Sequence, residues 1–108
     1  MPYVDKKNAL RYLSNPNDFN TYKAMFSKMY NNKLVEKIKN YKENNSANDL
    51  YDVVNNVYNI ALNIGSNVLY DEASNILNMI NKGEIESISI ESIIDVIEQV
   101  KIELDLIK

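Results

Sequence analysis

The sequence predicts an all-α protein: an antiparallel up-down four-helix bundle with a short accessory N-terminal helix. Only two Gly and two Pro occur in 108 residues, so long helices are favoured over a turn-rich fold. Apolar residues recur at steps of three and four along several long segments. Short connections between those segments make consecutive helices antiparallel neighbours. No repeat or second unit is visible, so residues 1–108 are expected to form a single domain.

The first half of the chain is expected to hold a short helix over residues 6–13 and then a long helical stretch. Asn15-Pro16 is a start signal, with Asn as N-cap and Pro at the first helical position. The stretch that follows is either one helix or two with a bend at Asn31-Asn32. Its inward residues are expected to be Phe19, Tyr22, Met25 or Phe26, Met29 or Tyr30, Leu34, Ile38 and Tyr41.

Three further helices are expected over residues 47–64, 67–81 and 89–107. Ser46 with Asp49 resembles a capping arrangement, and Gly65 is a suitable residue for a helix end. The isoleucine-rich segment 84–88 leaves the start of the last helix open. The residues expected to face inward are Leu50, Val53, Val57, Ile60, Ala61 and Ile64, then Val68, Leu69, Ala73, Ile76, Leu77 and Ile80, then Ile90, Ile93, Ile97, Val100, Leu104 and Ile107.

The composition excludes much chemistry, because the chain holds no cysteine, no tryptophan and no histidine. Thiolate nucleophiles, disulfides and zinc-thiolate sites need cysteine. Histidine-based catalysis and histidine-ligated metals need the imidazole that is missing. The carboxylate pairs Asp71-Glu72 and Glu84/Glu86 lie near expected helix starts, where acids favourably meet the helix dipole. We therefore expect no enzyme activity, no cofactor and no metal site.

Charge is distributed unevenly along the chain, which carries a net charge of −3. Residues 1–44 hold nine basic and four acidic side chains, whereas residues 45–108 hold three basic and eleven acidic ones. This asymmetry indicates either a basic face for an acidic partner or oppositely charged helices packed side by side. With Arg11 as the one arginine, nucleic acid is not an expected partner.

No apolar run of membrane-spanning length and no signal peptide is visible, so we expect a cytoplasmic protein without membrane contact.

The expected helix over residues 47–64 carries an unusual outer face. On a wheel of about 100° per residue, Asn55 points straight away from the inward residues. Tyr51, Tyr58 and Leu62 lie within a turn or two of it on the same side. Such a group indicates either a partner-contact patch or flank packing against a neighbouring helix.

The segment DLYDVVNNVYNIALNIG, residues 49–65, resembles the central helix of histidine-containing phosphotransfer (HPt) domains, whose pattern is H-x-L-K-G-x-[AS]-x-x-[IL]-G. Val57, Ala61, Ile64 and Gly65 fit that frame. Residues 9–13 and 17–29 are similar to the short first helix and long second helix of the family. The resemblance implies a four-helix bundle with one accessory helix, in agreement with the periodicity.

The chemical positions of the frame have changed. Asn55 stands at the phosphoacceptor histidine, Tyr58 at the lysine that offsets phosphate charge, and Asn59 at the glycine that lets a receiver domain come close. An amide has no nucleophilic nitrogen near pH 7, so Asn55 cannot carry a phosphoryl group. The chain therefore resembles an HPt domain without its chemistry, a pseudo-HPt of phosphorelay signalling.

The resemblance implies a receiver domain of a response regulator or hybrid histidine kinase as partner. The expected contact centre consists of Asn55, Tyr58, Asn59, Tyr51 and Leu62, with Lys33 and Lys37 as steering charges. A second hypothesis is a structural or self-associating bundle without a signalling role, in which the tyrosine patch would be a homodimer surface.

Overall fold

The computed structural model describes residues 3–107, and within that range it contains helices and no strand. The α-helices are α1 (Lys6–Leu10), α2 (Asp18–Asn31), α3 (Leu34–Glu43), α4 (Ala47–Ala61), α5 (Asn67–Asn81) and α6 (Glu91–Leu106). Short 3-10 turns, Leu62–Ile64 and Ile85–Ser87, follow α4 and precede α6. The all-α prediction is confirmed. In the described part of the chain no helix is both long enough and apolar enough to cross a bilayer.

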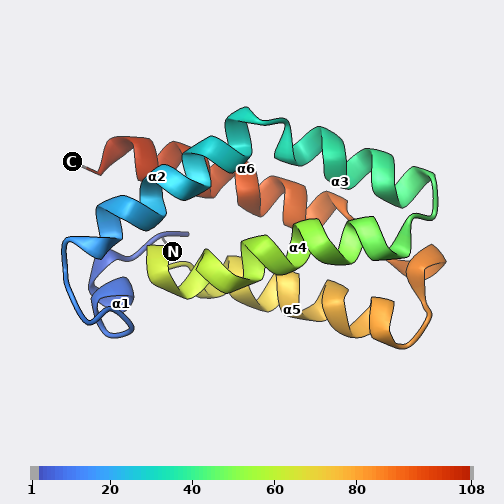
Figure 1. The fold of residues 1–108 in the computed structure, drawn as a ribbon, viewed down its shortest axis with the longest axis horizontal. Helices are drawn as coiled ribbons and strands as arrows, with labels where there is room; N and C mark the ends of the chain where they lie inside the picture. Colours follow the sequence, from blue (N-terminus) through green and yellow to red (C-terminus); the bar gives the residue numbers. More distant parts are fainter. Residues whose placement is uncertain (1–2, 108) are drawn as a thin grey trace.

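The long helices run back and forth along one axis (Figure 1). Helices α2 and α3 follow each other along one edge, α4 returns beside α3, α5 runs out again, and α6 returns toward the start of α2. The most extensive contact is between α4 and α5, followed by that between α3 and α4. Helix α6 packs against α5 and α2. Helix α4 therefore has a packed neighbour on each flank.

The break between α2 and α3 decides one alternative that the sequence left open. Lys33 adopts a left-handed conformation with φ of 67°, which no helix interior allows, so the stretch forms two helices. The start is later than expected: Asn17, and not Asn15, precedes the first helical residue, Asp18. Asn15 instead forms a turn, in which its side-chain oxygen accepts a hydrogen bond of 2.9 Å from the Asn17 amide.

Most of the expected core is confirmed, with one exchange of adjacent residues in α4. Leu50, Val57 and Ala61 are fully buried, as expected. Val53, however, is half-buried, and its neighbour Val54 is fully buried in its place. In α2 the core residue is Phe26, whereas Met25 is 44% exposed.

Some expected element ends were also wrong. Helix α1 ends at Leu10 instead of at residue 13, and α6, whose start the sequence left open, begins at Glu91. Ser46 precedes α4 as expected but makes no side-chain capping bond.

A tight turn at Gly65 joins the α4–α5 pair to the N-terminal segment. Gly65 has φ of +79°, and its carbonyl accepts a hydrogen bond of 2.9 Å from the Asp5 amide. A Cβ atom at this position would lie 2.0 Å from the Asp5 carbonyl oxygen. The next residue, Ser66, is buried and caps α5 by accepting a hydrogen bond from the Leu69 amide. Only glycine allows both the backbone conformation and the close approach.

Gly65→Ala should therefore destabilise the fold more than Gly83→Ala does. Both glycines have positive φ, so both variants bear the left-handed strain of roughly 1–2 kcal/mol. A Cβ at Gly83 meets nothing within 4 Å, so the second variant isolates the strain alone. Urea unfolding measures the two free energies, and equal losses would contradict the close approach of Asp5 to Gly65.

Candidate partner-binding face of helix α4

The solvent-facing line of α4 is a row of polar residues. Asn48, Asp52, Asn56 and Asn59 are exposed, and their spacing of four, four and three places them along one side of the helix. The row lies between the flank that packs on α5 and the flank that packs on α3. We call these four residues the α4 row.

Asn55 lies beside the α4 row and not at its centre. It is half-buried, and not fully exposed as its expected position straight away from the core requires. In the core of this helix Val54 takes the place of Val53, whereas the other inward residues are buried as expected. Asn56 is the more exposed of the two amides.

Tyr58, at the lysine position of the HPt frame, packs on Tyr70 of α5. Their ring centroids are 4.7 Å apart at an interplanar angle of 24°, and their hydroxyl oxygens lie 2.9 Å apart. The hydrogen bond with Tyr58 is the main cause that raises the pKa of Tyr70 above its ordinary value, so this hydroxyl stays neutral over the physiological range. Tyr58 therefore offers an aromatic edge where the frame has a cation.

The remaining members of the expected contact centre surround this tyrosine pair. Asn59 is fully on the surface, whereas Tyr51 and Leu62 are half-buried. Tyr51 lies two turns before Tyr58, so both side chains lie on the flank of α4 that meets α5. The sequence analysis did not include Tyr70 in the contact centre. Tyr70 lies on α5 and joins this face only through its contact with Tyr58, which residue spacing along the sequence does not indicate.

Lys37, on α3, lies beside the opposite flank of α4. It lines a surface hollow of about 240 Å³ together with Tyr41, Asp49, Asp52, Val53 and Asn56. Its ammonium group is exposed and borders the α4 row through Asp52 and Asn56. The structure thus brings Lys37 to the edge of the candidate face.

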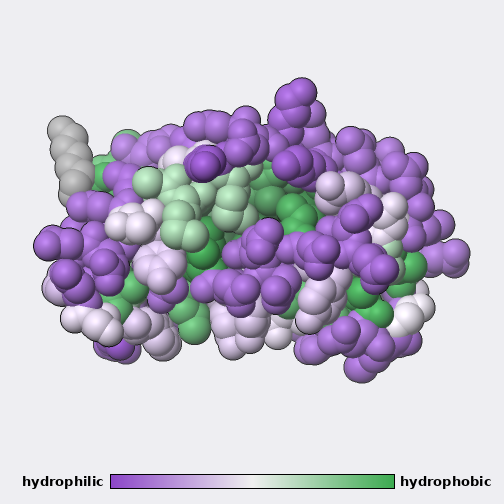
Figure 2. Space-filling view, viewed as in Figure 1, coloured by the Kyte–Doolittle hydropathy of each residue, from purple (hydrophilic) through white to green (hydrophobic). Residues whose placement is uncertain are grey.

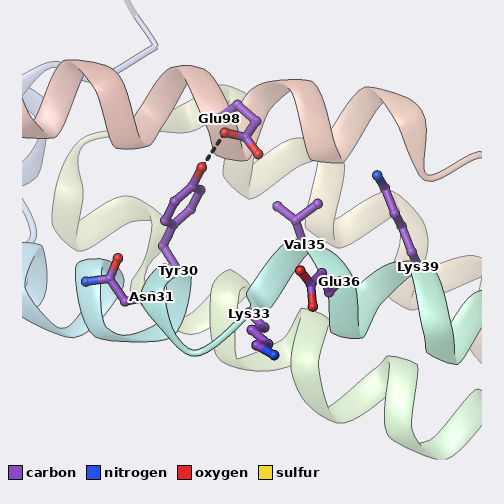
Figure 3. A pocket seen from close by; sticks show the side chains of 7 residues that line it. All are labelled: Tyr30, Asn31, Lys33, Val35, Glu36, Lys39 and Glu98. Carbon is purple, nitrogen blue, oxygen red and sulfur yellow. Dashed lines mark hydrogen bonds between the residues drawn. The ribbon is translucent and has the colours of Figure 1, made fainter.

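Lys33 is not brought to the same place. It lies at the α2–α3 break and lines a cavity of about 350 Å³ with Tyr30, Val35 and Glu98, on the side of α6 (Figure 3). In that cavity the Tyr30 hydroxyl donates a hydrogen bond of 2.5 Å to the Glu98 carboxylate. Lys33 and Lys37 therefore do not form a single basic group beside Asn55.

The candidate face offers contact surface and hydrogen bonds. Within residues 3–107, no three acidic side chains gather closely enough to hold a metal ion. The α4 row is made of three amides and one carboxylate, which donate and accept hydrogen bonds but are weak nucleophiles. This arrangement suits recognition of a protein surface.

Comparison with known proteins adds no identification: no protein-family model, no curated protein and no solved structure matches this chain.

The Tyr30–Glu98 contact predicts a pH effect on stability. The hydrogen bond to Glu98, together with burial and the negative charge of that carboxylate, raises the pKa of Tyr30. A raised pKa in the folded state means that this stabilisation is complete below the unfolded tyrosine pKa of about 10 and is lost as the pH rises through the folded value. The stability difference between the natural protein and Tyr30→Phe should therefore shrink above about pH 10. Urea unfolding across the alkaline range tests it, and a constant difference would contradict it.

Proposed function

We propose that this chain is an HPt-like module of phosphorelay signalling that binds a receiver domain and does not accept phosphate. In this proposal the helices form an up-down four-helix bundle, with α2 and α3 together serving as one of its four rods and α1 as the accessory helix. The antiparallel course of α4, α5 and α6 in Figure 1 supports this arrangement.

One observation carries the proposal. The positions of the HPt frame that are structural in the family, Val57, Ala61, Ile64 and Gly65, are all buried. The chemical positions Asn55, Tyr58 and Asn59 all lie at the surface or on its edge. This division between core and surface is the one that the family's frame requires.

The altered chemical positions favour binding over transfer. The Asn55 amide is neutral and not nucleophilic, and Tyr58 supplies no positive charge for a phosphoryl group. Asn59 adds a side chain at the point where the family has glycine, but it is exposed and can hydrogen-bond to an approaching surface. The aromatic edge of Tyr58 and the half-buried Leu62 provide apolar contact beside it.

Long-range attraction has a source on this face. Lys37 borders the α4 row, and a receiver domain presents an acidic pocket at its phosphorylation site. Opposite charges at the rim of an interface mainly raise the association rate. Lys33 lies farther from the centre of the α4 face and contributes only to the long-range electrostatic attraction.

Isothermal titration calorimetry with the receiver domains of the same organism tests the proposal. We expect binding by the natural chain and a loss of roughly tenfold or more in affinity for Asn59→Arg, which puts a bulky charge at the contact centre. Asn75→Arg is the matched control, because Asn75 is exposed on α5 about 140° around that helix from Tyr70. It should change affinity by about twofold at most. No heat with any receiver domain, phosphorylated or not, would contradict the proposal.

A second prediction concerns phosphate acceptance. After incubation with a phosphorylated receiver domain, the natural chain should carry no acid-labile phosphate. Asn55→His supplies the imidazole but should gain only weak transfer, because Tyr58 and Asn59 still lack the charge and the small residue. Adding Tyr58→Lys and Asn59→Gly should raise transfer further. Acid-labile phosphate on the natural chain would overturn the proposal.

The homodimer hypothesis for the same patch is less favoured. Tyr58, one of its two tyrosines, is already stacked on Tyr70 within the chain.

A further inference from the structure

A small apolar hollow lies on the other side of α4, between that helix and the α2–α3 junction. It has a volume of about 120 Å³ and is lined by Met29, Leu34 and Val53, with Asn32, Lys37 and Asn56 at its edge. Met25 lies one turn before Met29 and is 44% exposed, although it is a large apolar residue. Figure 2 shows the hydrophobic area here, enclosed by hydrophilic surface. We call Met25, Met29, Leu34 and Val53 the methionine hollow.

A second unpartnered apolar feature lies on α6. Asp95, Gln99, Ile102 and Leu106 are exposed, and their spacing of four, three and four places them along one line of the helix. Ile102 is 53% exposed and Leu106 is 76% exposed, the highest value among the large apolar residues of the described chain. This line, the α6 ridge, lies opposite the fully buried residues Ile97, Val100 and Leu104.

The two surfaces match in spacing. Met25 and Met29 are one helical turn apart, as are Ile102 and Leu106, so each pair spans roughly 6 Å. Lys37 lies at the edge of the hollow beyond the α2–α3 break, and Asp95 precedes Ile102 by seven residues, roughly 10 Å along α6. An α6 ridge laid antiparallel to α2 and α3 would therefore put Leu106 on Met25, Ile102 on Met29 and Asp95 near Lys37.

The two surfaces also match in charge. Lys37 is exposed at the edge of the methionine hollow, whereas the α6 ridge begins with Asp95 and is flanked by Asp105. Asp105 pairs with Lys101 along its own helix, so Asp95 is the carboxylate chosen as the partner of Lys37. Opposite charges at the rim of an apolar contact set its register and exclude other alignments.

We propose that a second copy of this chain docks its α6 ridge in the methionine hollow. Methionine side chains adapt to the shape of the residue that enters, which suits a hollow with flexible walls. In Figure 1, α6 passes behind α2, away from the face that holds the hollow. The two surfaces therefore lie on different faces, and the contact is head-to-tail: each copy receives one neighbour and is received by another. The proposal does not rest on receiver binding.

Analytical ultracentrifugation of paired variants tests this contact. The natural chain should show a mass that rises with concentration beyond that of a dimer. Met25→Glu blocks the hollow and Leu106→Asp blocks the ridge, so each variant alone should be monomeric. Mixed in equal amounts, the two should form a one-to-one complex and nothing larger, because each retains the half that the other lacks. Tyr12→Asp, at a residue 55% exposed and outside both surfaces, is the matched control and should associate like the natural chain.

Circular dichroism and urea unfolding of each variant establish that the monomers are folded, as expected for exposed positions. A natural chain that stays monomeric at all concentrations overturns the proposal, as does association that survives both single variants. Failure of the two folded variants to combine overturns the head-to-tail contact. Leu106 lies on α6 and outside the α4 face, so Leu106→Asp should leave receiver binding unchanged and separates this proposal from the receiver proposal.

Charge reversal tests the register separately. Lys37→Glu or Asp95→Lys alone should weaken association by roughly threefold to tenfold, since each replaces an attraction by a repulsion. The double variant should recover most of the loss, because the pair is restored with its signs exchanged. If the loss of affinity in the double variant equals the combined losses of the two single variants, the antiparallel register is excluded.

Discussion

The packing of α4 between α3 and α5 is the constraint on which the other features depend. Leu50, Val54 and Val57 are fully buried, and their burial fixes the rotation of α4 about its axis. Once the rotation is set, the polar α4 row must face solvent, the flank with Tyr58 must meet α5, and Val53 must meet the α2–α3 side. A rotation of one residue would bury an asparagine at a cost of about 1–3 kcal/mol for each unpaired polar group. Both candidate binding surfaces therefore follow from the same apolar stripe.

The turn at Gly65 connects α4 to α5. Gly65 adopts the left-handed conformation and ends the turn that follows α4. Helix α5 begins directly after it, with a first turn that Ser66 caps. The same glycine admits the Asp5 backbone, so the N-terminal segment is attached to the helix pair. Sequence reasoning placed Gly65 at a helix end but could not show the contact with Asp5, which is 60 residues away in the chain.

The all-α class, the long helices and most of the core could be predicted because apolar spacing reports directly on the buried face of a helix. The errors arose where two adjacent residues are equally apolar. Periodicity cannot choose between Val53 and Val54, and the choice depends on how α5 packs. Met25 and Phe26 posed the same problem, and the larger ring is the buried one. For the site, surface location was predicted, whereas the Tyr58–Tyr70 stack and the separation of Lys33 from Lys37 depend on contacts between helices.

We propose that a face of α4 binds a receiver domain without reacting. The most direct test is amide NMR of the isotope-labelled chain during titration with an unlabelled receiver domain. We expect shift changes along the α4 row, at Asn55 and Tyr58, and at Lys37, with the α6 ridge unaffected. Changes confined to α6, or none with any receiver domain of the organism, would contradict the claim.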